Sequence, residues 1–214
     1  MYLGSVTQGC LPIEYNYLWD EAFVNKSDKD CLLGYIAHYV SPQRAYYGGI
    51  LITDARGVPK EFRHSEGVRP SRVQSTLYGE SLEESLGTDA LAPALLGSVT
   101  IKPEILLLDK ESRLLFGQFA HANAPAALLV PLADPDLAFA DMLGVDGSLL
   151  DARDYDLKGS TSERVYAYIQ DRSDSVGARI LETAQKRMNL MSPFLRIRTV
   201  LAEIAQVETG RATK

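Results

Sequence analysis

The chain has 214 residues, of which 46% are apolar and 23% are charged, and its formal net charge is −6. This composition is that of a globular protein large enough to bury a core without disulfides or metals. The negative charge excludes a global basic field for nucleic acid or anionic lipid, so that nucleic acid could bind only through a local basic patch.

Cysteine use and targeting signals indicate a cellular compartment. Cys10 and Cys31 are too few for a disulfide framework and fit reduced thiols. Together with the histidines they show no zinc-ligand spacing. No run approaches the roughly 18 apolar residues of a membrane-spanning helix, and the N-terminus lacks the regions of a signal peptide. We therefore expect a cytoplasmic protein without a membrane partner.

The first half of the chain predicts strands paired in hairpins. Residues 31–40 are rich in β-branched and aromatic side chains, as strands are. Two glycines lead into the apolar run 50–53, and residues 54–57 form a tight turn before a strand that alternates around Phe62. Pro59 indicates an edge position or a bulge in this returning strand. Further strands are expected at 105–108, at 114–116 after a turn over 109–112, and at 126–132.

The remaining patterns predict helices. Residues 69–71 open a helix that runs to about Leu86, with Gly79 ending its first part and with Val73 and Leu77 on its buried side. Two apolar stripes near the C-terminus, the first starting at Val165, predict a pair of helices. We therefore predict an α+β fold with a central antiparallel or mixed sheet and packed helices. Its parts would be a core domain (1–133), an acidic, turn-rich connection (134–161) and the C-terminal helical pair (162–208).

This order of elements resembles the profilin or roadblock arrangement, in which helices pack on a central sheet. The resemblance covers element order alone, and no residue motif supports it. It implies no functional residues, but it does imply one candidate function, that of a profilin-like domain that senses a small ligand.

One polar surface lies on the returning strand and on the helix start that follows. Arginines at a helix start attract a phosphate or carboxylate, because backbone amides there add to the attraction. The surface is therefore a candidate site for an anion or a partner. Its residues are Glu61, Arg63, His64, Arg69, Arg72, Gln74 and Tyr78.

The same region offers an enzymatic alternative. A restriction-endonuclease-like enzyme binds a divalent metal through an Asp near one strand's end and a Glu on the next strand. Here Asp54, Glu61 and Glu66 would hold Mg²⁺ or Mn²⁺ in a phosphodiesterase or nuclease, with Arg63 or His64 on the phosphate. The match is partial, because Arg63 stands where Lys is expected and the turn separates Asp54 from Glu61 by about 10 Å.

The histidines add one candidate. His64 is flanked by charged residues, whereas His38 alternates with apolar neighbours and is expected to be a hydrogen-bonded residue at the core edge. His121 lies on a loop of small residues with no nucleophile near it. Nucleotide-binding loops, a nucleophile elbow and calcium-loop spacing are absent from the sequence.

Without such motifs, we expect a non-enzymatic accessory or assembly subunit of a larger bacterial-type cytoplasmic complex, without a cofactor. It would bind partner proteins, or a second copy of itself, through the C-terminal helices and the polar surface 61–72. The metal-dependent nuclease and the small-ligand sensor are the alternatives.

Overall fold

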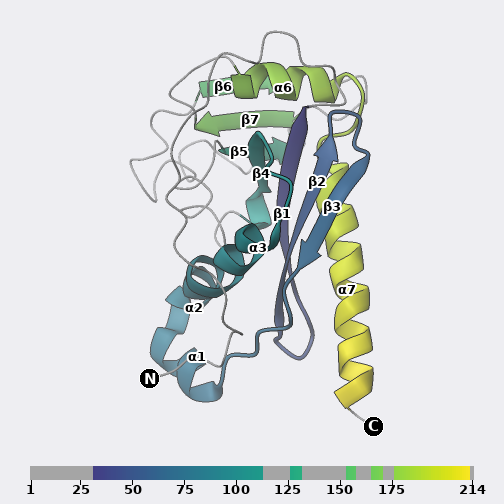
Figure 1. Ribbon diagram of the computed structural model, residues 1–214. Coiled ribbons are helices and arrows are strands. Elements are labelled where there is room, and N and C mark those ends of the chain that lie inside the picture. The colour runs from purple at the N-terminus through teal and green to yellow at the C-terminus, as the bar shows by residue number, and fades with distance from the viewer. Residues whose placement is uncertain (1–30, 113–125, 132–152, 158–164, 171–175, 213–214) are drawn as a thin grey trace.

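The computed structural model describes residues 31–112, 126–131, 153–157, 165–170 and 176–212. The described strands form one mixed sheet in the order β3-β2-β1-β4-β5-β7-β6 (Figure 1). This confirms the predicted α+β class with a mixed sheet and packed helices. The strands are β1 (Leu32–Val40), β2 (Tyr46–Asp54), β3 (Pro59–His64), β4 (Ile105–Asp109), β5 (Ala126–Pro131), β6 (Arg153–Leu157) and β7 (Val165–Gln170).

The direction of the strands changes at β1. Strands β1, β2 and β3 form an antiparallel meander, which confirms the predicted hairpin. Strand β4 returns to the other side of β1 and runs parallel to it, and β5 runs parallel to β4. The chain thus leaves β1 toward one side of the sheet and comes back on the other. Such a reversal is a topological switch point, and the carboxyl ends of β1 and β4 meet there.

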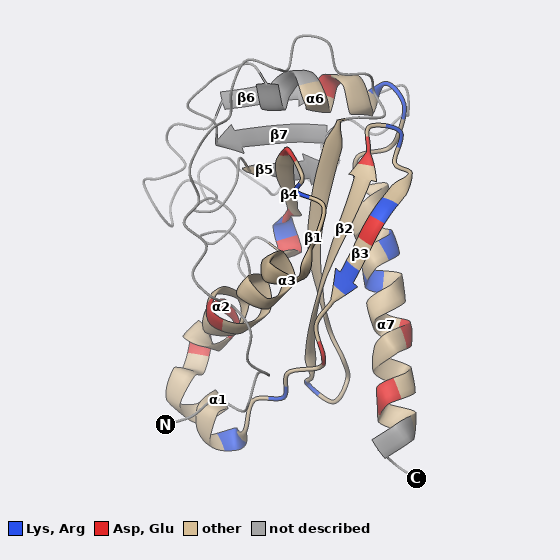
Figure 2. Cartoon of the chain, in the orientation of Figure 1, with Lys and Arg blue, Asp and Glu red and all other residues tan. Residues whose placement is uncertain are grey.

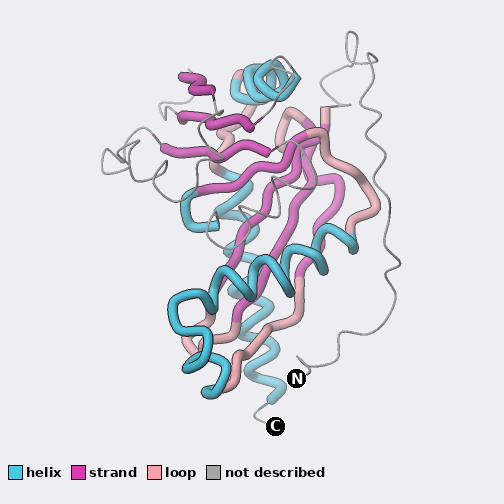
Figure 3. The backbone as a smooth tube through the Cα atoms, turned by 90° about the vertical axis from the view of Figure 1, so that its left-hand side faces the viewer, coloured by secondary structure: helices cyan, strands magenta, loops and turns pink. Residues whose placement is uncertain are grey.

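Helices cover both faces of the sheet. One face carries a winding segment with a π-helical turn, and α7 lies along the opposite face (Figure 3). The segment consists of α1 (Arg72–Tyr78), η2 (Gly79–Ser81), α2 (Leu82–Ser85), η3 (Leu86–Leu91) and α3 (Ala92–Ser98). The C-terminal helices are α6 (Val176–Gln185) and α7 (Ser192–Ala212).

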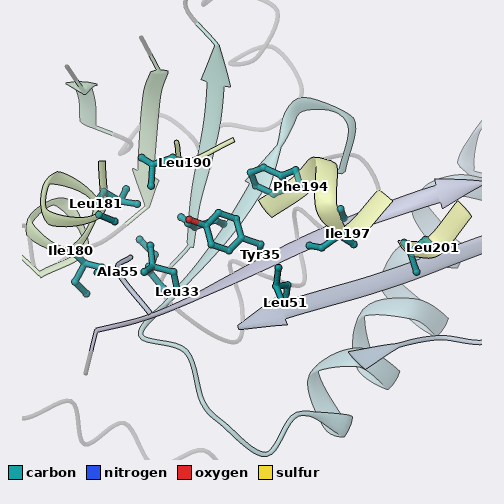
Figure 4. Packing of buried hydrophobic residues seen from close by; sticks show 14 of the residues in the cluster. Leu33, Tyr35, Leu51, Ala55, Ile180, Leu181, Leu190, Phe194, Ile197 and Leu201 are labelled. Atoms are coloured by element: carbon teal, nitrogen blue, oxygen red, sulfur yellow. The ribbon is translucent and has the colours of Figure 1, made fainter. Parts of the chain in front are cut away.

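The core has two layers because successive strand residues point to opposite faces. Tyr35 and Phe194 belong to the layer under α6 and α7, where their rings meet edge to face with centroids 5.2 Å apart (Figure 4). The layer under η3 and α3 contains Ile36, Ile50 and Leu95. The charged residues of β3 contrast with this interior, since both basic and acidic residues lie along that strand, whereas β1 has no Lys, Arg, Asp or Glu (Figure 2).

Gly49 explains how α7 packs against β2. A Cβ atom at this position would lie 2.7 Å from Cγ2 of Ile197, which is closer than real side chains approach. The absence of a side chain therefore lets the helix approach the strand backbone. Ile197 and Leu201 of α7 are consequently buried against the middle of the sheet.

Two details of the predicted helices are wrong. The stretch Val165–Gln170 is strand β7, paired with β5, rather than the start of a C-terminal helix. Its β-branched and aromatic residues fit the pattern of a strand as well as that of an apolar helical stripe. In α1, Val73 and Leu77 are 64% and 74% exposed instead of buried, although the predicted opening over 69–71 and the end at Gly79 agree with a helix capped by Ser71 and Gly79.

Some predictions lie outside the described residues. These are the thiol of Cys10, the strand 114–116, His121 and most of the acidic stretch 134–161. The division into parts at 133 and 161 stays a prediction. In the part of the chain that the structure describes, no helix combines the length and the apolar character needed to cross a membrane.

Candidate functional site

Asp54 organises the turn between β2 and β3. Its side chain is fully buried and accepts hydrogen bonds from the backbone amides of Arg56 and Val58 at 2.9 and 3.1 Å. The Arg56 guanidinium and the Lys60 ammonium lie 2.8 and 3.3 Å from its other oxygen. Burial raises the pKa of Asp54, but the hydrogen bonds from Arg56, Val58 and Lys60 outweigh it and lower the pKa to about 2. This carboxylate therefore has a structural role.

Glu61 ties β3 to the segment after α3. Its Oε2 accepts hydrogen bonds from the amides of Ile101 at 2.8 Å and Thr100 at 3.0 Å. Its Oε1 lies 2.7 Å from Nη2 of Arg63. The Ile101 amide, followed by the Thr100 amide and Arg63, lowers the pKa of Glu61 to about 2 against a smaller effect of burial. Glu61 pairs with Ile52, one residue from the register that the turn predicts.

The structure does not bring the expected metal ligands together. His64 and Phe62 stack on the same side of β3, with ring centroids 6.1 Å apart, and Glu61 and Arg63 occupy the alternate positions. Glu66 is exposed beyond the end of β3. No cluster of three or more His, Cys, Asp or Glu side chains suited to a metal occurs among the described residues. Mg²⁺ or Mn²⁺ thus finds no fitting ligand set at these positions.

The rest of the polar surface divides into capping and exposed residues. Ser71 and Gln74 form a capping box, in which the Ser71 amide donates to Gln74 Oε1 at 2.8 Å and the Gln74 amide donates to Ser71 Oγ at 3.2 Å. Gln74 is therefore engaged by the helix start. Arg69, Arg72 and Tyr78 are exposed and stay candidates for contact with an anion.

A second polar cluster lies at the carboxyl end of β4, and the sequence analysis missed it. Asp109 ends the strand and forms a two-pronged ion pair with Arg198 of α7, with Nη1–Oδ2 and Nη2–Oδ1 distances of 2.6 and 2.9 Å. The same Nη2 lies 3.1 Å from Glu111 Oε2 and 3.2 Å from Ser112 Oγ. The Ser112 amide donates to Asp109 Oδ1 at 3.0 Å.

His38 lies near this end of β1. Burial lowers the pKa of His38, and Arg198 lowers it further, while Asp109, Glu83 and Glu111 act in the opposite direction. The imidazole is therefore mainly neutral at pH 7. Among the described residues, its buried Nδ1 atom has no hydrogen-bond partner, so that the hydrogen bond expected for His38 is not found at this atom. We call His38, Asp109, Glu111, Ser112 and Arg198 the carboxyl-end cluster.

The sequence contains one local signal for this cluster. Asp109 directly follows four buried apolar residues, so that a charge is fixed where a core strand ends. From the sequence, however, residues 109–112 were expected to form a turn between two strands, whereas residues 110–112 are helical in the structure. The partner Arg198 is 89 positions away in the chain, and it lies beside Asp109 only because α7 packs on β1 and β2.

Comparisons with known proteins identify no family. No protein-family model matches the chain, and no curated protein does. Among solved structures, endonuclease V of Ciona intestinalis, in complex with a DNA containing an inosine followed by a ribo-adenosine, is similar at 10% identity and a TM-score of 0.41. That match covers 84% of this chain and 91% of the endonuclease chain.

Two further solved structures are similar to the chain. Human ENDOV has 14% identity and a TM-score of 0.38, over 85% of each chain. The Argonaute of Marinitoga piezophila, in complex with a 5′ OH guide RNA, has 12% identity and a TM-score of 0.34. That match covers 74% of this chain and 25% of the Argonaute chain.

These neighbours contradict one main prediction. The solved structures that match are endonucleases and an Argonaute, so the expectation of a non-enzymatic accessory subunit in a bacterial-type complex is wrong against this comparison. The nuclease alternative stays a prediction, and the ligands expected for it do not form a cluster among the described residues. No described arrangement bears on the small-ligand sensor, which stays a prediction.

Proposed function

We propose that the chain binds nucleic acid and cleaves a phosphodiester bond at the carboxyl-end cluster. The observation that supports this most is the position of the cluster. In open sheets with parallel strands, ligands bind outside the carboxyl ends of the strands, at the point where the chain reverses its course through the sheet. Asp109 and His38 lie at such ends, and Glu111, Ser112 and Arg198 surround Asp109.

The residue types suit a phosphodiester. The Arg198 guanidinium carries five N–H donors, so that it could contact a phosphate oxygen while it keeps its ion pair with Asp109. His38, whose pKa is lowered by burial and which is therefore neutral at pH 7, is the member of the cluster able to accept a proton. The exposed Arg69 and Arg72 would provide the local basic patch, and Tyr78, 41% exposed, would stack on a base.

A divalent metal does not fit the carboxyl-end cluster as the side chains now lie. Both oxygens of Asp109 accept from Arg198, and Glu111 contacts the same guanidinium. The proposal therefore assigns no step to a metal. Arg198 would bind phosphate, Asp109 would orient Arg198, and His38 would hold or release a proton.

An oligonucleotide cleavage assay tests this proposal. Single-stranded DNA, duplex DNA, RNA and a DNA containing an inosine followed by a ribo-adenosine would each be incubated with Mg²⁺, with Mn²⁺ and with EDTA. We expect cleavage of at least one substrate, and a loss of about 100-fold in Asp109→Asn. Glu66→Gln, which changes an exposed carboxylate outside the cluster, is the matched control and should cleave normally.

Two outcomes would reject the proposal. The enzymatic function is wrong if no substrate is cleaved under any of the conditions. The assignment of the site is wrong if cleavage occurs but is unchanged in Asp109→Asn.

A further inference from the structure

We propose that Arg198 is a built-in counter-ion that occupies the position of a divalent cation between Asp109 and Glu111. Its guanidinium would exclude Mg²⁺ or Mn²⁺ from these carboxylates, and a neutral side chain at position 198 would create a cation site. The view that this cluster is a functional site rests on the proposed function. The cation site itself is tested without any measurement of activity.

The contacts of the guanidinium carry the inference. Four oxygens from Asp109, Glu111 and Ser112 lie between 2.6 and 3.2 Å from its two terminal nitrogens. Carboxylate and hydroxyl oxygens are the ligands that hard divalent cations prefer. Three of the four oxygens converge on the single nitrogen Nη2, as ligands converge on an ion.

Burial and charge explain why one cation would replace another. The Asp109 side chain is only 7% exposed, and the Arg198 side chain is 21% exposed. A buried carboxylate without a partner is costly, because it has lost its hydration and gained no compensating charge. Two carboxylates next to each other add repulsion. When Arg198 is removed, a divalent cation from solution is the simplest replacement for the lost charge.

The chain provides a matched control two residues earlier on α7. Arg196 also reaches back to the sheet, but its Nη1 donates to the backbone carbonyl of Gly57 at 3.1 Å. Its replacement removes an arginine from the same helix without uncovering the Asp109 carboxylate. A general effect of lost charge or loosened packing would appear in both variants, whereas a cation site would appear only at position 198.

Titration of Mn²⁺ into the full chain, followed by calorimetry and by the electron-spin signal of free Mn²⁺, tests the inference. We expect Arg198→Met to bind one Mn²⁺ with a Kd on the order of 10⁻⁴ to 10⁻³ M, as weak oxygen sites do. Wild type and Arg196→Met should bind at least tenfold more weakly. The double variant Arg198→Met with Asp109→Asn should lose the site. Mn²⁺ should also raise the Tm of Arg198→Met alone.

Clear results would overturn the inference. It fails if wild type binds Mn²⁺ as tightly as Arg198→Met does, or if the folded variant binds none. Circular dichroism and gel filtration would verify folding, and Arg198→Gln, which is still polar, would replace the Met variant if that variant does not fold. Arg198→Lys keeps a positive charge and should not bind Mn²⁺.

The two proposals fail separately. If Arg198→Met binds Mn²⁺ but wild type cleaves nothing, the counter-ion is supported and the enzymatic function is rejected. If wild type cleaves and loses activity in Asp109→Asn, but Arg198→Met binds no Mn²⁺, the function is supported and the counter-ion is rejected.

Discussion

The turn between β2 and β3 and the carboxyl end of β4 both stabilise a buried carboxylate, but they do so with different kinds of partner. Each holds a buried carboxylate, Asp54 in the first and Asp109 in the second. Asp54 takes its partners from residues two to six positions further along the chain, and two of them are backbone amides. Asp109 has one local partner, the Ser112 amide, and its only charge partner among the described residues is Arg198 of the distant helix α7. The first arrangement is set by neighbours in the sequence, whereas the second forms only when α7 packs on the sheet.

The largest effect is expected where the turn is broken. Asp54→Ala leaves the amides of Arg56 and Val58 and two basic side chains without their acceptor, so it should lower the free energy of unfolding by about 3 kcal/mol. Urea unfolding followed by circular dichroism measures this loss. Asp54→Asn keeps the shape and should cost less. A loss below about 1 kcal/mol in Asp54→Ala would contradict the structural role.

Glu61→Gln should have an intermediate effect that depends on pH. The pKa of Glu61 is about 2 in the folded chain and higher when unfolded, so its contribution is complete above about pH 4.3 and disappears as pH falls through about 2. The variant should lose about 1 to 2 kcal/mol at pH 7.

The pH dependence of unfolding distinguishes this effect from a loss of packing. Between about pH 4.3 and 2, the free energy of unfolding should fall more gently in Glu61→Gln than in wild type. Equal slopes would show that Glu61 does not titrate as the geometry requires. Glu66→Gln is the control with an exposed carboxylate.

The smallest effect on stability is expected at Glu111. A small effect there would show that this part of the carboxyl-end cluster contributes less to stability than the turn at Asp54. The Glu111 side chain is 70% exposed, and exposed ion pairs contribute little. Glu111→Gln should therefore change the free energy of unfolding by less than about 0.5 kcal/mol. In the Arg198→Met background it should weaken Mn²⁺ binding several-fold in calorimetry. Unchanged Mn²⁺ affinity would remove Glu111 from the proposed ligand set.

The sequence predicts what neighbouring residues determine. The tight turn closed by Gly57, the Ser71 cap and the break at Gly79 were all predictable, because each depends on residues a few positions apart. Strand β7 was not, since a six-residue apolar stretch fits either period until its partner β5 is known. The exposure of Val73 and Leu77 also depends on where α1 lies relative to the sheet.

The candidate site was harder to predict than the fold. The polar residues around β3 attract attention because they adjoin one another in sequence, but Asp54 and Glu61 are occupied by their own surroundings. The carboxyl-end cluster joins β1, β4 and α7, and no spacing between His38, Asp109 and Arg198 indicates that they meet. Such a site becomes visible only when the order of strands is known.

Helix α7 is fastened near both of its ends. Arg196 bonds to the turn at Gly57 near its start, and Glu208 near its end accepts a hydrogen bond of 2.9 Å from the Tyr47 hydroxyl of β2. Between them, Ile197 and Leu201 lie against the backbone of Gly49. The helix is thus held near its start, in its middle and near its end by contacts with β2 and the turn that follows it. With the helix held in this way, the release of Arg198 from Asp109 would require the rotation of one side chain and no movement of α7 as a whole.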